Sequence, residues 1–141
     1  MTHLLLAVLV AAQTGDSTNS ADQQFATQAM HQLLQGVSNA DAAQSGGDAQ
    51  LKSIATTIQT DQIGIGNQLV SLASYYGINV STDPVKASTD ASGYAAAETE
   101  SLKTLIVLFE NEKQNGGGAE LRSFAVQELP TLQKDLAALQ N

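Results

Sequence analysis

The stretch that decides the fold is residues 51–76, LKSIATTIQTDQIGIGNQLVSLASYY. Its apolar side chains recur in alternating steps of four and three residues, and one polar side chain, Gln62, interrupts the series. The complete seam is Leu51, Ala55, Ile58, Gln62, Ile65, Leu69, Leu72 and Tyr76. Such spacing is typical of long α-helices that pack side by side. The stretch therefore predicts a helix from about Asp48 to Tyr76, with Gly77 as the residue that ends it.

Three further segments carry apolar side chains at helical spacing. They run from about Ala21 to Gln44, from about Ser88 to Gln114 and from about Ala119 to Leu139. Ser20 and Gln23 form a capping-box pattern before the first segment. Pro130 lies inside the last one, where it removes a backbone hydrogen bond and predicts a kink. Because no strand pattern of useful length is present, we expect an all-α, antiparallel four-helix bundle over residues 21–141.

The composition fits a single acidic domain. The chain has 141 residues, of which 43% are hydrophobic and only 4% aromatic. This favours packing of small side chains over a bulky aromatic core. Six Lys and Arg residues oppose fourteen Asp and Glu residues, so no basic patch is available for phosphates and we expect no nucleic-acid binding. The absence of cysteine excludes disulfides, thiolate metal sites and cysteine nucleophiles.

The N-terminus has an apolar run at residues 4–12, LLLAVLVAA. The run is too short to span a bilayer, but it resembles the core of a signal peptide with a cleavage site before Gln13. No Lys or Arg precedes it, only His3, so an ordinary apolar start of a strand or helix is the alternative. We expect residues 1–12 to be a signal peptide and residues 13–20 a flexible N-terminus. The protein would then be periplasmic or secreted in a bacterium, without membrane insertion after cleavage.

Few residues in the predicted bundle could do chemistry. His31 is its only histidine, and a lone helical histidine is usually a surface residue. Four carboxylates could approach one another across the bundle and are the candidates for binding a metal: Asp61, Glu98, Glu128 and Asp135. Di-metal sites in such bundles normally add two Glu-x-x-His pairs, which this chain lacks. We therefore expect the carboxylates to be solvated, with no metal, no cofactor and no enzymatic activity.

Gly64 and Gly66 lie inside the predicted second helix, where each costs about 1 kcal/mol relative to alanine. No strand precedes them and position 69 is leucine, so they do not form a dinucleotide-binding loop. We expect close approach of a neighbouring helix at these glycines. The alternative is that they leave room for an apolar ligand.

A family pattern also emerges from several stretches. They are Phe25 with Ala29, Leu-Val-Ser-Leu-Ala at 69–73, Tyr94 with Val-Leu-Phe-Glu at 107–110, and Ser-Phe-Ala-Val-Gln-Glu-Leu-Pro-Thr-Leu at 123–132. Together they resemble the exported bacterial domain of unknown function 4142, most specifically through Phe-Ala-x-x-x-Leu-Pro-x-Leu. The resemblance covers about Ala21 to Asn141. It implies a ferritin-like four-helix domain behind a signal peptide.

The chain departs from that family at its polar positions. The resemblance implies Asp-His where this chain has Asp61-Gln62, a second Asp-His at Ser101-Leu102, a histidine at Asp135 and a glutamate at Gly36. Only Asp61 keeps the family residue type. Gln62 is then a polar residue on a core seam, and it needs a hydrogen-bond partner because an unpaired buried amide costs about 1–3 kcal/mol. We expect that partner to be Asp61, Ser101, Asp135 or the backbone.

Three functions remain open. The first is a non-catalytic, exported helical bundle with a structural, stress-related or interaction role in the bacterial envelope. The second is a ferritin-like metal-binding or redox protein that uses carboxylates. The third is a binder of small apolar ligands within the bundle. A protein partner is possible under the first, and the sequence leaves the oligomeric state open.

Overall fold

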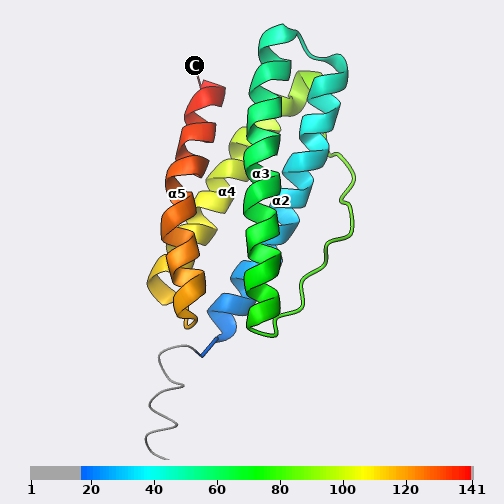
Figure 1. The fold of residues 1–141 in the computed structure, drawn as a ribbon. Helices are drawn as coiled ribbons and strands as arrows, with labels where there is room; N and C mark the ends of the chain where they lie inside the picture. Colours follow the sequence, from blue (N-terminus) through cyan, green and yellow to red (C-terminus); the bar gives the residue numbers. More distant parts are fainter. Residues whose placement is uncertain (1–16, 141) are drawn as a thin grey trace, which may run out of the picture.

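A computed structural model describes residues 17–140 as a bundle of four long helices (Figure 1). They are α2 (Ser20–Gly46), α3 (Ala49–Tyr75), α4 (Tyr94–Asn115) and α5 (Ala119–Gln140), and a short 3₁₀ helix, η1 (Ala91–Gly93), leads into α4. The described part of the chain contains no strand. The predicted all-α four-helix bundle is therefore confirmed. Within the same residues, no helix is both long and apolar enough to cross a membrane.

The helices follow an arrangement with one long crossover. α2 packs against α3 and α4, α4 packs against α5, and α3 and α5 make the lightest contact of these neighbouring pairs. After α3 the chain returns along the length of the bundle before α4 begins, so each neighbouring pair is antiparallel (Figure 1). The crossover lies against α2, where Gln35 Nε2 donates to the carbonyl of Lys86 at 2.7 Å and Ser38 donates to that of Val85.

The first helix begins one residue earlier than its predicted capping box. Asn19, not Ser20, is the N-cap, and its side chain accepts from the Asp22 N–H at 3.1 Å. Asp22 Oδ2 accepts in return from the Asn19 N–H at 2.7 Å, so Asp22 takes the place predicted for Gln23. Asn19 and Ser20 thus cap and begin α2 although the sequence assigns them to a flexible N-terminus. The predicted signal peptide and residues 13–16 lie outside the described residues.

The third predicted helix starts too early. Helical structure begins with η1 and continues as α4 from Tyr94, whereas the sequence predicts a start at Ser88. The reason is that Ser88 holds the crossover: its N–H donates to Asn39 Oδ1 at 2.8 Å. Asp90 then caps η1 by accepting from the Gly93 N–H at 3.1 Å. At the end of α3, Gly77 has φ of 72°, which confirms its predicted role because that left-handed conformation favours glycine.

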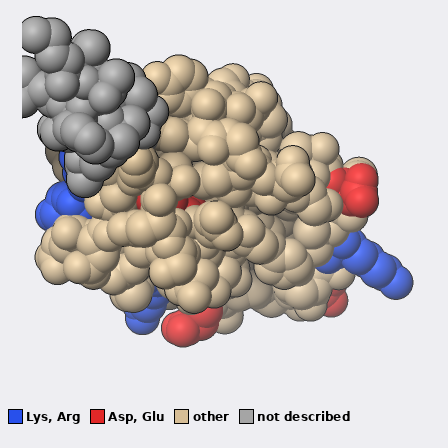
Figure 2. All heavy atoms as spheres, turned by 90° about the horizontal axis from the view of Figure 1, so that it is seen from below, with Lys and Arg blue, Asp and Glu red and all other residues tan. Residues whose placement is uncertain are grey.

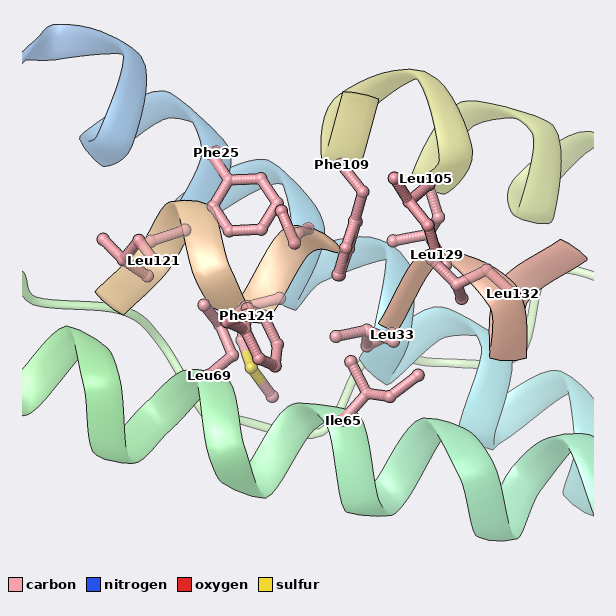
Figure 3. Packing of buried hydrophobic residues seen from close by; sticks show 14 of the residues in the cluster. Phe25, Leu33, Ile65, Leu69, Leu105, Phe109, Leu121, Phe124, Leu129 and Leu132 are labelled. Carbon is pink, nitrogen blue, oxygen red and sulfur yellow. The ribbon is translucent and has the colours of Figure 1, made fainter. Parts of the chain in front are cut away.

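Three aromatic rings form the centre of the larger apolar core (Figure 3). Phe25 of α2 meets Phe109 of α4 edge to face with ring centroids 4.9 Å apart, and Phe124 of α5 lies 5.5 Å from Phe109. Leu69 and Ile65 cover this group from α3 (Figure 3). Each edge-to-face aromatic pair contributes about 0.5–1.5 kcal/mol beyond its buried area. The three phenylalanines of the chain are therefore concentrated where α2, α4 and α5 meet.

Pro130 lies inside α5, which continues past it to Gln140. Proline has no N–H, so the carbonyl of Val126 loses its partner within the helix. Val126 and Pro130 both lie on the exposed side of α5. This explains how the helix tolerates the proline, and the predicted kink remains a prediction.

Candidate functional site

Four polar side chains lie together inside the bundle and are called the polar layer here: Asp61 and Gln62 of α3, Glu98 of α4 and Asp135 of α5. Gln62, Glu98 and Asp135 are each 1% exposed or less, and Asp61 is half-buried. A smaller apolar cluster around Tyr94 is separate from the phenylalanine core. Glu98 is buried because it lies on the inner face of α4: Tyr94, Glu98 and Leu102 follow one another in steps of four.

Gln62 closes the space between α2, α3 and α4. Its Nε2 donates to Glu98 Oε1 at 2.5 Å, so the partner is Glu98 and the predicted partners are wrong. A methyl group built on Gly36 would lie 2.5 Å from Gln62 Nε2 and 2.6 Å from its Oε1. Gly36 is thus the residue that leaves room for this amide. Gln62 is buried, as the sequence predicts for a polar residue of the core, and its side chain lies at the centre of the layer.

Asp61 and Asp135 form a carboxyl pair on the other side of the layer. Their side chains are within hydrogen-bonding reach of each other, which requires a proton on one of them. Burial raises the pKa of Asp135 to about 8, helped by the hydrogen bond to Asp61 and the charges of Asp61 and Glu98. Burial, followed by the charge of Asp61, also raises the pKa of half-buried Glu128. Asp61 thus interacts with Asp135 and Glu128, and Asp135 with Glu98. Glu98 and Asp135 are buried, so the prediction that the carboxylates are solvated is wrong for these two.

The pKa values of two further ionisable groups, Glu98 and Tyr94, are raised as well. Burial raises the pKa of Glu98 to about 7, although the hydrogen bond from Gln62 partly offsets it. Burial raises the pKa of the Tyr94 phenol as well, with further contributions from the charges of Glu98 and Asp135. The site can therefore store protons near neutral pH. Neighbouring carboxyl groups that cannot all ionise together are expected to behave in this way.

The polar layer contains carboxyl oxygens, but within residues 17–140 they are not grouped as a set of metal ligands. The amide oxygen of Gln62 has no N–H or O–H donor within residues 17–140, and neither do three buried carboxyl oxygens, Asp61 Oδ2, Glu98 Oε2 and Asp135 Oδ2. Such atoms can face a cation or carry a proton. However, no three His, Asp or Glu side chains in the described chain are placed to hold a metal ion together. The structure thus brings the predicted carboxylates together without arranging them as ligands.

The other residues at positions marked by the family resemblance pack or hydrogen-bond with neighbouring helices. Ser101 Oγ donates to Gln32 Oε1 at 2.9 Å, and Leu102 lies in the phenylalanine core. His31 is exposed on α2 and borders a shallow hollow with Thr104 of α4. No second histidine of the described chain accompanies it.

The two glycines of α3 differ from each other. A methyl group built on Gly66 would lie 3.3 Å from Met30 Cε, so α2 does approach closely there. At Gly64 nothing lies within 4 Å, and the predicted close packing is wrong because this position faces open space. A hollow of about 130 Å³ lies beside Gly66 between α2 and α3, with Leu33, Val37 and Ile63 among its lining residues.

Sequence reasoning missed a second buried acid group at the opposite end of the phenylalanine core. Asp22 of α2 and Glu112 of α4, called the terminal acid pair here, are both 0% exposed. Burial raises the pKa of Glu112 to about 9, with the hydrogen bond and the charge of Asp22 adding to the effect. A signal was present: Leu102, Leu105, Phe109 and Glu112 follow in steps of three, four and three, which puts Glu112 on the buried side of α4.

Comparison with known proteins gives one match. No curated protein and no solved structure matches the chain. A family model described as a domain of unknown function, DUF4142, matches residues 8–141. This range includes all four helices, the polar layer and the terminal acid pair, so the chain belongs to the family of domain of unknown function 4142.

Proposed function

We propose that this protein is a non-catalytic helical bundle, exported to the bacterial envelope, where it has a structural, stress-related or interaction role. One observation carries the proposal. The amide of Gln62 occupies the space in front of Gly36 and bonds to Glu98, so the protein's own side chain fills the space beside the position where the family resemblance implies a glutamate.

Two further features support this proposal. Carboxyls and an amide supply the polar groups of the layer, and His31, the only histidine within residues 17–140, is exposed on α2. The apolar run at residues 4–12 supports export. The long crossover between α3 and α4 is a connection that ferritin-like bundles also use, so the architecture is compatible with descent from a metal-binding bundle.

The second candidate function is metal or redox chemistry on carboxylates. The buried oxygens of Asp61, Glu98 and Asp135 that lack donors favour it. The two candidates differ in what neutralises those oxygens, because protons suffice under the first and a cation is needed under the second.

A metal-binding assay separates the candidates. Purified protein is incubated with Fe²⁺, Mn²⁺ or Zn²⁺ at pH 7, desalted, and measured for bound metal and melting temperature. We expect no stoichiometric metal and no change in melting temperature, since a ligand of the folded state would raise it. One retained ion per chain would overturn the proposal in favour of the metal-binding candidate.

A gain-of-binding variant sharpens this assay. Gly36→Glu combined with Gln62→His and Asp135→His places the residue types of the family resemblance around Asp61. The three atoms nearest to a Cβ built on Gly36 all belong to the glutamine that is replaced. We expect the variant to retain metal that the wild-type chain does not.

Export is tested separately. The full chain is expressed in a Gram-negative bacterium, and its location and N-terminus are determined by fractionation and mass spectrometry. We expect a periplasmic product that begins at Gln13. A cytoplasmic product that keeps Met1 would contradict the envelope role.

A further inference from the structure

The terminal acid pair lies where three parts of the chain meet. The N-terminal residues before α2 pack against the turn between α4 and α5, and Asn19 Nδ2 donates to the carbonyl of Asn115 at 3.1 Å. Figure 2 views the bundle from this end, where uncharged residues form most of the visible surface and charged side chains stand mainly at its rim. Both carboxyl groups of the pair are buried.

Asp22 has a full set of donors. Its Oδ2 accepts from the N–H groups of Asn19 at 2.7 Å and Gly117 at 2.9 Å, and both of its oxygens accept from the Gly118 N–H at 3.2–3.3 Å. Burial acts to raise the pKa of Asp22, but these hydrogen bonds together with one from Glu112 lower it. Asp22 is thus the ionised member of the pair.

Glu112 has no donor. Neither of its oxygens receives an N–H or O–H from a side chain or backbone group within residues 17–140. Arg122 of α5 does not take that role, because its Nη1 donates to the carbonyls of Gly116 and Gly117 at 3.1 and 2.9 Å. A buried carboxyl without donors, placed within hydrogen-bonding reach of an ionised one, is satisfied when it carries a proton and donates it.

The glycines of the turn serve this arrangement. A methyl group built on Gly116 would collide with Glu112 Oε2, and one built on Gly117 would collide with the carbonyl of Ser17. On the α3 side, Tyr76 borders Gly118 and its hydroxyl accepts from the Glu120 N–H at 3.0 Å. The ionisable groups that these contacts involve are Asp22, Glu112, Tyr76, Glu120 and Arg122.

We propose that Asp22 and Glu112 form a proton-dependent clasp: one shared proton fastens the start of α2 to the α4–α5 turn, and opening this end of the bundle releases that proton. The clasp does not depend on the proposed envelope role. Lowering the pH favours the closed end of the bundle, and raising the pH favours its opening. The sign follows from linkage, since Glu112 binds its proton more tightly when the end is closed than when it is open to water.

The proton itself is measured first. The wild-type protein is labelled with ¹³C at its carboxyl groups, and the chemical shift of Glu112 is followed from pH 3 to pH 10. We expect a midpoint near 9, since burial and Asp22 raise the pKa of Glu112 to about that value. A midpoint near that of an exposed glutamate would overturn the proposal.

The opening is measured by limited proteolysis of the turn. Glu112→Gln keeps a donor toward Asp22 but has no proton to lose, and Glu110→Gln on the same helix is the matched control. We expect the cleavage rate of wild-type protein relative to Glu112→Gln, within residues 115–120, to rise about tenfold per pH unit between pH 6 and 8. The rate relative to Glu110→Gln stays flat. A flat ratio for Glu112→Gln as well would overturn the clasp.

Discussion

The bundle buries carboxyl groups in two places, and the two places differ in the hydrogen-bond donors that they offer. At the end of the bundle, Asp22 is buried but receives backbone N–H groups from Asn19, Gly117 and Gly118, and its pKa is lowered. In the middle, the amide of Gln62 is the donor to Glu98, and burial raises the pKa of both Glu98 and Asp135. The difference teaches that donors, rather than burial alone, decide whether a carboxylate inside a bundle keeps its charge.

The largest predicted effect is the loss of the donor-rich carboxylate. Asp22→Ala removes one half of the capping box and leaves the N–H groups of Gly117 and Gly118 without an acceptor. We expect the free energy of unfolding in urea at pH 7 to fall by about 3 kcal/mol. Asp83→Ala, at an exposed position of the crossover, is the control and should change it by less than about 0.5 kcal/mol. An equal loss for Asp22→Ala and Asp83→Ala would contradict the stabilising role of the N–H groups that surround Asp22.

The next prediction concerns pH. Glu98 and Asp135 have raised pKa values in the folded state, of about 7 and about 8, so their stabilising contribution is complete below the unfolded values and is lost as pH rises through the folded ones. We expect the free energy of unfolding to fall by several kcal/mol between pH 5 and pH 8, and Glu112, whose pKa is also raised, adds to this fall. Urea unfolding across this range measures it.

Asp135→Asn is the matched variant for that pH dependence. Its amide can still donate to Asp61 but cannot ionise, so the decline with pH should be shallower than in the wild-type protein. Stability that rises from pH 5 to pH 8 in the wild-type protein would contradict the account of the polar layer.

A smaller effect is expected from the one amide that serves the layer. Gln62→Leu removes the hydrogen bond that favours ionised Glu98, so we expect a loss of about 1–2 kcal/mol at pH 8 and a smaller one at pH 5. Gln68→Leu, exposed on the same helix, should behave alike at the two pH values. A Gln62→Leu effect that does not depend on pH would show that the amide acts by packing alone.

The helices and their inner faces could be predicted from the sequence because both depend on spacing along one segment. The partner of Gln62 could not, since contact with Glu98 depends on how α3 and α4 are rotated relative to each other. Gly36 was marked only as a departure from the family resemblance, and its steric role needs the coordinates of two helices. The sequence also placed the start of α4 too early, because a tertiary contact of Ser88 with Asn39 overrides the local pattern there.

The terminal acid pair could not be predicted from the sequence for a different reason. Glu112 lies on the apolar face of α4 by its spacing from Phe109, yet it also stands two residues from Glu110 and so suggests an exposed charged run. The capping box at Asn19 and Asp22 competes with the overlapping Ser20 and Gln23 pattern. What decides between them is that Asp22 also binds the distant turn between α4 and α5, a contact across 95 residues that no local pattern contains.

The most direct test of this account is a ¹³C carboxyl titration of Glu98 and Asp135 in the wild-type protein without added metal. A closed polar layer that neutralises its acids with protons predicts midpoints near pH 7 and pH 8. Ionisation of both groups below about pH 5, as in water-exposed carboxyls, would contradict it.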